Sequence, residues 1–458
     1  MLHLQPWHGL ALLHAAAVAG GLLLYVGLTH SGRQRRPPSA AMAWVLALLA
    51  FPYLALPTYL LLGTRKLAHT ATSGEGAQPP SRLADDPATR GLDLPPPRRC
   101  ASVRIHGRGD EALQALLDLL AGAQRRIDVE IFIFRDDEVG RRIVEALASA
   151  SRRGVMVRAL IDGLGTLENH RRIRADLHAA GVRTRWFSPI RLRLRPQFGR
   201  GNLRNHRKLV LVDGRTLWSG GRNFAAEYFL GTSGTPAWHD LSFCIESGIV
   251  ADAAEGFARD WALAGGTPDV TPPDPDILPT GPVAQLLPGG PDRREDTAYA
   301  LYLNAIHRAD ARVWLATPYF VPDDALQLSL LLAARRGADV RLLLPARSNH
   351  RLADIARERS LRELAAAGVR IALLPLMLHA KLALVDRRFA SCGSINLDSR
   401  SLFLNYELNV LFHDPAQIDT FDDWFRGLFA LADAYTPRTS GWLRDLGEGA
   451  VRAIGFQL

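Results

Sequence analysis

The sequence predicts an α/β protein made of two tandem domains with mainly parallel sheets, packed around one shared site and preceded by a transmembrane helical hairpin. Two long uncharged stretches open the chain. From about residue 125, apolar runs of strand length alternate with stretches of helical period, a pattern typical of α/β domains. The series then occurs a second time, which indicates an internal duplication. The aligned segments are 125–134 with 311–320, 154–162 with 337–345, and 179–186 with 366–373.

The first 64 residues are predicted to form the membrane hairpin. Residues 9–28 and 41–63 carry no charged side chain, and each is close to the ~20 residues that a helix needs to cross a bilayer. Pro52 and Pro57 predict a kink in the second helix. The opening residues contain no Lys or Arg, which argues against a cleaved signal peptide. We expect a multi-pass protein of the cell inner (plasma) membrane. The side that its site faces is left open, because the flanking positive charges are nearly balanced.

Composition shifts divide the rest of the chain. Stretches rich in Pro, Gly and Ser predict one linker at 65–100 and another at 265–282. The two expected domains are therefore 101–264 and 283–458. Each is long enough to bury a hydrophobic core of its own.

Charge and rare residues narrow the function classes. The net charge of +9 and the isoelectric point near 9.9 favour an anionic partner, which could be a phospholipid surface, a phosphate ester or a nucleic acid. The three cysteines show no CxxC spacing, so neither a disulfide framework nor a zinc site is predicted. Only three lysines occur, Lys66, Lys208 and Lys381, and two of them stand at equivalent places in a repeated motif. That restriction indicates a need for a compact ammonium charge.

The repeated motif reads HRKLVLVD from residue 206 and HAKLALVD from residue 379. Residues two apart in a strand point to the same face, so His206 and Lys208 should project together. His379 and Lys381 repeat this arrangement in the second copy. Each copy therefore presents one imidazole and one ammonium group side by side.

The closing aspartates of the motif, Asp213 and Asp386, have the opposite parity. We count them with the catalytic set of the motif, although a structural role suits them better than contact with the same substrate. A turn of small residues ending in Asn follows each Asp, as GGRN in the first copy and GSIN in the second. Such a turn lets backbone and amide donors approach an anion. The predicted substrate-binding residues are Gly221, Asn223, Ser394 and Asn396.

Together the two copies offer two imidazoles, two ammonium groups and two amides, all suited to a phosphate. Two histidines across one phosphorus are what a double displacement requires, one as nucleophile and one as acid for the leaving oxygen. The lysines would stabilise charge on the other oxygens, so neither a metal nor a cofactor is expected. The alternative interpretation is a set of solvent-facing residues on edge strands, and two copies with the same spacing argue against it.

Written as HxKx4Dx6G(G/S)xN, the motif resembles that of the phospholipase D superfamily, and the paired apolar start resembles the bacterial cardiolipin synthases within it. The resemblance implies a phosphatidyl-histidine intermediate, with His206 as nucleophile and His379 as general acid. It also implies that Asp240 and Glu407 orient the opposing histidines. Gly221 departs from the family pattern, in which many relatives carry Ser, so one hydroxyl donor to phosphate is expected to be missing.

The reaction that the resemblance implies joins two phosphatidylglycerol molecules into cardiolipin with release of glycerol. The expected partners are phospholipid substrates and the membrane, without nucleic acid, and the oligomeric state is left open. A phospholipase D-type hydrolase of phospholipids is the first alternative, since water competes for the same intermediate. A superfamily nuclease would use the same histidines, but a membrane hairpin gives it no advantage. A non-catalytic membrane scaffold would not need two intact motifs.

Overall fold

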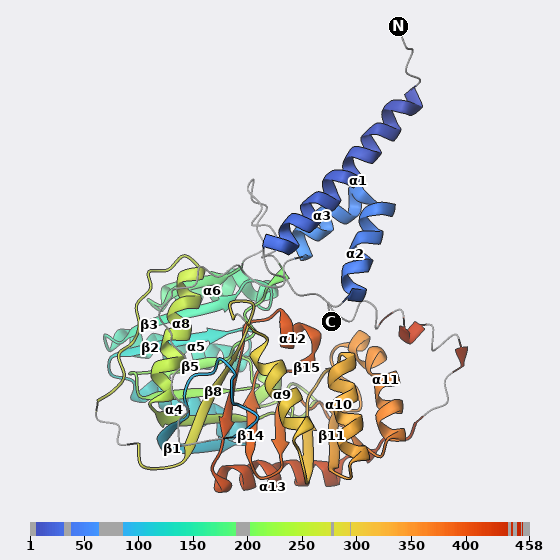
Figure 1. Ribbon diagram of the computed structural model, residues 1–458. Helices are drawn as coiled ribbons and strands as arrows, with labels where there is room; N and C mark the ends of the chain where they lie inside the picture. Colours follow the sequence, from blue (N-terminus) through green and yellow to red (C-terminus); the bar gives the residue numbers. More distant parts are fainter. Residues whose placement is uncertain are drawn as a thin grey trace.

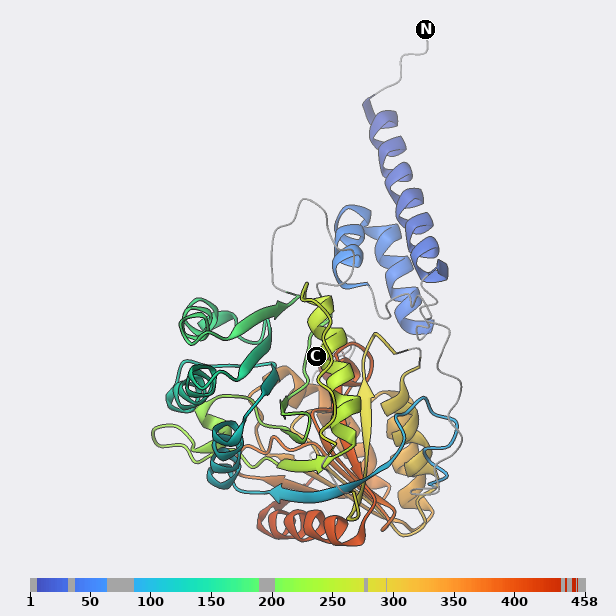
Figure 2. The same ribbon diagram turned by 90° about the vertical axis from the view of Figure 1, so that its left-hand side faces the viewer.

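The computed structural model describes residues 6–31, 38–63, 86–188, 202–275, 279–293, 295–437, 441–442, 447–449 and 451. A globular part made of both repeats carries the N-terminal helices on one side (Figure 1). A view turned by 90° shows the same separation between these helices and the globular part (Figure 2).

One mixed sheet of 15 strands runs through the globular part, and its strand order repeats. From the middle outward the first half has β1 (Arg98–His106), β7 (Ser242–Ser247), β6 (Thr216–Gly220), β5 (Leu209–Val212), β2 (Arg126–Ile131), β3 (Met156–Asp162) and β4 (Arg183–Phe187). The second half has β8 (Val283–Gly289), β16 (Glu407–Phe412), β14 (Phe389–Gly393), β13 (Leu382–Val385), β9 (Arg312–Ala316), β11 (Asp339–Pro345), β12 (Arg370–Leu374) and β17 (Asp433–Ala434). The short strands β10 (Phe320–Val321) and β15 (Leu397–Asp398) pair separately. The topology thus repeats as the sequence does.

The prediction of mainly parallel sheets is wrong. Within the large sheet only β2, β3 and β4, and the equivalent β9, β11 and β12, pair in parallel. The other strand pairs, including those of the motif strands β5 and β13, are antiparallel. The reason is the turn after each motif strand. Asp213 (φ 56°) and Gly214 (φ 70°) reverse the chain at once, and so short a connection can join only antiparallel neighbours.

The two halves are joined at the sheet edge and by packing. β1 pairs with β8, where Arg98 lies opposite Ala284, and this pairing makes the sheet continuous. One apolar cluster contains residues of both halves, and in it Phe243 packs edge-on to Phe412 with ring centroids 5.2 Å apart. Two further clusters belong to one half each. The halves therefore form one packed unit.

Helices flank the sheet, and α5, α10, α12 and α13 begin at an aspartate whose side chain caps the helix. Asp137 and Asp323 cap α5 and α10 by accepting hydrogen bonds from the backbone N–H groups of Gly140 (2.9 Å) and Leu326 (3.0 Å). The first half contains α4 (Gly109–Gly122), α5 (Glu138–Arg152), the 3₁₀ helix η1 (Leu167–Asn169), α6 (His170–Ala179), α7 (Ala226–Phe229) and α8 (Ile249–Leu263). The second half contains α9 (Thr297–His307), α10 (Asp324–Arg335), α11 (Arg351–Ala366), α12 (Ser399–Phe403) and α13 (Pro415–Leu431). Of these, α8 and α13 pack into the cluster that the halves share.

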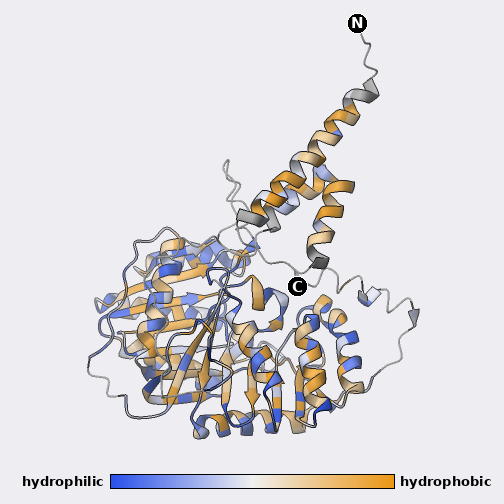
Figure 3. Cartoon of the chain, in the orientation of Figure 1, coloured by the Kyte–Doolittle hydropathy of each residue, from blue (hydrophilic) through white to orange (hydrophobic). Residues whose placement is uncertain are grey.

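The N-terminal segment folds as three helices, α1 (Pro6–Ser31), α2 (Pro38–Ala50) and α3 (Pro52–Leu62). Within the described ranges, Gly9–Thr29 of α1 is the one helix that is long and apolar enough to cross a membrane. Figure 3 shows hydrophobic residues along α1 and on the two shorter helices. The three helices pack together through Tyr25, Leu48 and Tyr59.

The predicted single helix over 41–63 is wrong, because the chain breaks at Phe51 between α2 and α3. Pro52 has no N–H to continue the hydrogen-bond ladder of α2, and its ring would clash with a carbonyl one turn back. The kink expected at Pro52 and Pro57 is thus present as a break before Pro52, whereas Pro57 lies inside α3. With 13 and 11 residues, neither α2 nor α3 is long enough for a membrane crossing, so a second spanning helix is not supported.

The segments expected to be linkers are only partly described. Residues 64–85 lie outside the described ranges, and β1 already begins at Arg98, inside the linker expected at 65–100. Residues 276–278 of the second linker are also outside the described ranges. β8 begins at Val283, immediately after that linker.

Candidate active site

Each motif histidine lies just before its strand, where the chain pairs with the other half. His206 precedes β5, and its N–H donates to the carbonyl oxygen of Tyr406 (2.9 Å). His379 precedes β13, and its N–H donates to the carbonyl oxygen of His239 (2.7 Å). The expectation that these side chains project from a regular strand is therefore wrong in detail. The backbone here bonds across the boundary between the halves and not to a neighbouring strand.

A carboxylate from the second half holds the imidazole of His206. Nδ1 of His206 lies 3.0 Å from both carboxylate oxygens of Glu407, which is fully buried at the start of β16. The ring packs edge-on to Phe132, with centroids 4.9 Å apart. Burial lowers the pKa of His206 to about 4 against the opposing effect of Glu407, and the ammonium of Lys208 adds to the lowering.

A carboxylate from the first half holds the imidazole of His379 in the same way. Nδ1 of His379 lies 2.8 Å from Oδ2 of Asp240, which is fully buried. Tyr228 packs edge-on to the ring, with centroids 4.9 Å apart. Burial and the ammonium of Lys381 lower the pKa of His379 to about 3, although Asp240 acts to raise it.

Both histidines therefore have the same protonation pattern. Burial acts to raise the pKa of Asp240 and of Glu407, but the adjacent histidines and lysines lower both pKa values overall, so both groups are carboxylates. A carboxylate only accepts hydrogen bonds, so the proton of each neutral ring is on Nδ1 and the lone pair is on Nε2. At neutral pH the resting site holds two neutral imidazoles.

The two motif lysines are buried but differ in their contacts. Nζ of Lys208 donates to the carbonyl oxygen of His206 (2.8 Å). Nζ of Lys381 donates to the carbonyl oxygen of His379 (2.5 Å) and lies 3.1 Å from Nε2 of the same ring. Burial lowers the pKa of Lys208 to about 7 and that of Lys381 to about 8. Among the described residues, none hydrogen-bonds to Nε2 of His206, so the two rings are not equivalent.

The aspartates that close the motifs lie at the far end of the motif strands. Asp213 accepts hydrogen bonds of 2.7–2.8 Å from three successive backbone N–H groups, at residues 124–126. Asp386 does the same at residues 310–312, with distances of 2.9–3.2 Å. Each Asp thus ties the turn after its motif strand to the start of the neighbouring antiparallel strand, β2 or β9. These contacts agree with the structural role that the parity of Asp213 and Asp386 suggested, and their place in the catalytic set stays a prediction.

The small-residue turns contact the two carboxylates. Oγ of Ser394 donates to Oε2 of Glu407 (2.5 Å) and accepts from the N–H of Leu408 (2.9 Å). At the equivalent place in the first half, a Cβ on Gly221 would stand 2.2 Å from Oδ1 of Asp240. The glycine therefore has a steric cause. The hydroxyl of Ser394 is already engaged with an acid, so the expectation that such a hydroxyl serves the phosphate is not supported.

The two asparagines of these turns also differ. Oδ1 of Asn223 accepts a hydrogen bond from the N–H of Ile133 (3.1 Å). Oδ1 of Asn396 is buried and has no hydrogen-bond partner in the described part of the chain. A buried acceptor without a partner is costly. The unpaired Oδ1 of Asn396 is therefore an acceptor that a bound ligand could satisfy.

Two residues beside these groups were not predicted. Oγ of Ser401 donates to Oε1 of Glu407 (2.7 Å), and Oδ2 of Asp162 accepts from the N–H of Asn205 (2.9 Å), the residue before His206. Ser401 lies in the polar stretch NLDSRS after the second motif, and Asp162 ends a buried strand. A polar run and an acid at a strand end were the available signals.

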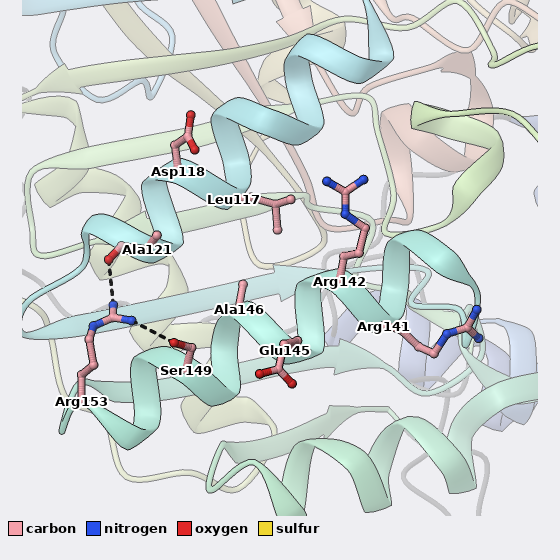
Figure 4. Close-up of a pocket in the computed structure, with 9 residues that line it drawn as sticks. All are labelled: Leu117, Asp118, Ala121, Arg141, Arg142, Glu145, Ala146, Ser149 and Arg153. Carbon is pink, nitrogen blue, oxygen red and sulfur yellow. Dashed lines mark hydrogen bonds between the residues drawn. The ribbon is translucent and has the colours of Figure 1, made fainter.

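An open hollow between α4 and α5 lies apart from these groups (Figure 4). One of its arginines, Arg153, is engaged with the carbonyl oxygen of Ala121 (2.9 Å) and with Oγ of Ser149 (3.3 Å). The lining residues are Leu117, Asp118, Ala121, Arg141, Arg142, Glu145, Ala146, Ser149 and Arg153. None of the predicted site residues lines it. Across the described ranges, no group of three or more His, Cys, Asp or Glu side chains is placed to hold a metal ion.

Comparisons with known proteins point to one family. Residues 116–261 and 302–429 match the family described as cardiolipin synthase, PLD-like domain. Cardiolipin synthase A of Pseudomonas fluorescens (strain SBW25) is 33% identical over 447 residues, which cover 91% of this chain and 92% of that protein. Cardiolipin synthase of Geobacillus thermodenitrificans (strain NG80-2) is 34% identical over 408 residues, which cover 83% of this chain and 80% of that protein.

A solved structure shows the same fold. The crystal structure of phosphatidylserine synthase from Haemophilus influenzae Rd KW20 matches with a TM-score of 0.61 at 16% identity, and the match covers 81% of this chain and 99% of that one. The two regions that match the family fall in the two halves of the repeated topology. This chain is therefore a phospholipid-modifying enzyme, and it belongs to the cardiolipin synthase family with its paired phospholipase D-like domains.

Proposed function

We propose that this enzyme joins two phosphatidylglycerol molecules into one cardiolipin and one glycerol, at a site that both halves share. The reciprocal pairing of His206 with Glu407 and of His379 with Asp240 carries the proposal. Each imidazole comes from one half and its carboxylate from the other, so neither half alone holds a complete pair. Two oriented imidazoles across one phosphorus suit a double displacement through a covalent intermediate.

In the first step, Nε2 of His206 attacks the phosphorus of one phosphatidylglycerol, and the bond from phosphorus to the glycerol oxygen breaks. His206 is assigned as the nucleophile because its Nε2 has no hydrogen-bond partner among the described residues, whereas the ammonium of Lys381 lies against the ring of His379, 2.9 Å from Nδ1 and 3.1 Å from Nε2. The anionic phosphodiester raises the pKa of His379 by its charge, so Nε2 takes a proton from the neighbouring ammonium of Lys381 and gives it to the leaving oxygen. The proton that His379 accepts in the second step then restores the ammonium of Lys381.

In the second step, the headgroup hydroxyl of another phosphatidylglycerol gives its proton to His379. Its oxygen attacks phosphorus, the phosphorus–nitrogen bond breaks, and His206 is free again. Water at the same place would give phosphatidic acid. The site must therefore hold the second lipid close to His379 and exclude water.

Charge stabilisation during both steps is assigned to the buried cations. The ammonium groups of Lys208 and Lys381 lie beside the two histidines and are balanced in the resting site by Asp240 and Glu407. A phosphate that enters this site brings extra negative charge to preplaced cations in a buried setting. The unpaired Oδ1 of Asn396 is an acceptor and suits a headgroup hydroxyl, whereas only its Nδ2 could donate to a non-bridging oxygen.

The long apolar helix α1 supports a membrane anchor, which we place in the inner (plasma) membrane. An anchored enzyme meets both substrates in the plane of the bilayer. The effective concentration of the second lipid there is high, which favours transfer to a lipid hydroxyl over transfer to water.

Product analysis tests the proposal. Purified enzyme in bilayers with phosphatidylglycerol as the only substrate should form cardiolipin and glycerol in equal amounts, as measured by lipid mass spectrometry and a glycerol assay. Mostly phosphatidic acid would identify a hydrolase. Cardiolipin that forms only after phosphatidylethanolamine is added would preserve the reaction type and change the donor. Cleavage of a DNA oligonucleotide without any lipid turnover would identify a nuclease.

A further inference from the structure

Two buried arginines stand beside the two orienting carboxylates, and both belong to the first half. Arg207 is the middle residue of the HRK triplet, and Arg222 lies in the GGRN turn. The second copy has Ala380 and Ile395 at the equivalent positions. Arg207 is 4% exposed and Arg222 is fully buried, so both guanidinium groups are withdrawn from water.

Arg222 is held by neutral oxygens. Its guanidinium donates to Oγ of Ser242 (3.1 Å) and to the carbonyl oxygens of Asp240 (2.5 Å), Tyr228 (3.0 Å), His106 (3.2 Å) and Gly107 (3.2 Å). Among the described residues no carboxylate oxygen forms an ion pair with it. Burial lowers the pKa of Arg222 although the nearby charge of Asp240 acts to raise it, so this buried cation is costly, which indicates that its bonds serve a purpose beyond stability. The shortest of them fixes the main chain of Asp240, the residue whose carboxylate orients His379.

Arg207 has the equivalent contact on the other side. Its Nε donates to the carbonyl oxygen of Glu407 (3.1 Å), the residue whose carboxylate orients His206. A second nitrogen donates to the carbonyl oxygen of Gly289 (3.3 Å), at the end of β8, and a third forms an ion pair with the buried Asp260. Arg207 therefore joins the first motif to two strands of the second half.

We propose that Arg207 and Arg222 are positioning residues, each of which fixes the main chain of one orienting acid and thereby the direction of Nε2 on the opposing histidine. Neither guanidinium needs to touch the substrate. A misplacement of about 1 Å in a catalytic group costs on the order of 10²-fold in rate. A displaced acid would therefore lower kcat and leave the KM for lipid nearly unchanged. The inference rests on the proposed function in one respect, because its test measures glycerol release from phosphatidylglycerol.

The test compares Arg207→Met and Arg222→Met with a matched control, Arg158→Met. Arg158 is 3% exposed, lies in the same half and donates twice to Asp128 (2.7 and 2.8 Å), but it contacts neither orienting acid. Glycerol release from phosphatidylglycerol is measured in mixed micelles of varied lipid fraction, which separates kcat from the surface KM. The thermal melting curve of each variant shows whether it is folded and how stable it is.

We expect Arg207→Met and Arg222→Met to lower kcat on the order of 10²-fold, with KM within about threefold of wild type. Arg158→Met should lower the melting temperature by a comparable amount and keep kcat within about threefold. Arg207→Lys and Arg222→Lys keep a buried cation but not the fork that bonds several carbonyls at once. The two Lys variants should have a kcat nearly as low as that of the Met variants. If a Met variant does not fold, its Lys variant tests the positioning role instead.

Folded Met or Lys variants with the kcat of wild type would overturn the inference, as would a control that loses as much kcat as they do. A wild-type protein that releases no glycerol contradicts the proposed function instead. The same variant set is then compared on whichever phospholipid the wild type turns over, so the two failures are distinguishable.

Discussion

The hydroxyl of Ser394 donates to Oε2 of Glu407 at 2.5 Å and so fixes the carboxylate that holds His206. The first half uses the opposite solution, in which Gly221 leaves no side chain against the shorter Asp240. The two halves thus differ at equivalent positions. The second half has a longer acid that is hydrogen-bonded to a hydroxyl, and the first half has a shorter acid that packs against a glycine.

Gly221→Ala should be more damaging than Ser394→Ala. The new methyl group would meet Oδ1 of Asp240, which also accepts from the N–H of Leu241 (2.7 Å), so the acid has no free direction in which to move. We expect kcat for glycerol release to fall on the order of 10²-fold. Loss of the Ser394 hydroxyl should cost roughly tenfold, the equivalent of one hydrogen bond to a charged group.

Gly256→Ala is the matched control, because a Cβ there meets nothing within 4 Å. It should leave kcat unchanged and raise the melting temperature slightly, because Ala is the better residue inside helix α8. Wild-type kcat in folded Gly221→Ala would show that the close approach to Asp240 is not needed for turnover.

Replacing either motif histidine by Ala should remove nearly all transfer from phosphatidylglycerol, with losses on the order of 10³-fold or more. A donor with a p-nitrophenyl leaving group separates the two roles, because p-nitrophenolate leaves without a proton. His379→Ala should then regain a burst of p-nitrophenolate, whereas His206→Ala should not, since it lacks the nucleophile. Stopped-flow absorbance measures the burst, and the reverse result would exchange the two assignments.

The pH dependence of kcat/KM should show loss of activity on the alkaline side. Burial lowers the pKa of Lys208 to about 7 and of Lys381 to about 8, so their charge is present at lower pH and is lost as pH rises through 7 to 8. The histidines, with pKa values of about 4 and 3, stay neutral in the free enzyme from pH 5 upward. A profile measured from pH 5 to 9 on a short-chain phosphatidylglycerol should therefore lack an acidic limb near 6.5. An acidic limb at that pH would contradict the burial of the two imidazoles.

Asp213→Ala and Asp386→Ala should reduce stability and spare catalysis. Each change leaves three backbone N–H groups without their acceptor and places Ala at a positive φ. Most of these N–H groups are exposed and can bond to water, so the loss should be about 2–3 kcal/mol. The melting temperature should fall, and kcat per folded molecule should stay within about threefold. Asp213→Asn should lose less, since Asn tolerates the left-handed region. Wild-type melting combined with lost kcat would return these residues to the catalytic set.

The sequence contained enough to predict the duplication and the four motif side chains that we propose to react. Repeated spacing identified His206, Lys208, His379 and Lys381, and strand parity separated them from the aspartates. Strand direction was not predictable, because side-chain periodicity is the same in parallel and antiparallel strands. The break at Phe51 depended on which proline would end a helix.

The pairing of acids with histidines was available only through resemblance. Asp240 lies 139 residues from His379, and Glu407 lies 201 residues from His206, so no local pattern links them. The hydrogen bonds of Arg222 were still harder to predict from the sequence. Most of them go to backbone carbonyl oxygens, which every residue type has.

The exchange of acids between the halves separates this chain from a symmetric pair of identical subunits. In a two-fold homodimer one gene position serves both sides, so an Asp or an arginine on one side must recur on the other. Covalent fusion removes that constraint. At equivalent positions of its two copies, this chain has Asp240 and Glu407, Gly221 and Ser394, and Arg222 and Ile395. Such unlike residues at equivalent positions are possible only because the two copies lie in one chain. Under the proposed mechanism, joining the copies lets one histidine serve in attack and the other in proton transfer, although both come from the same ancestral motif.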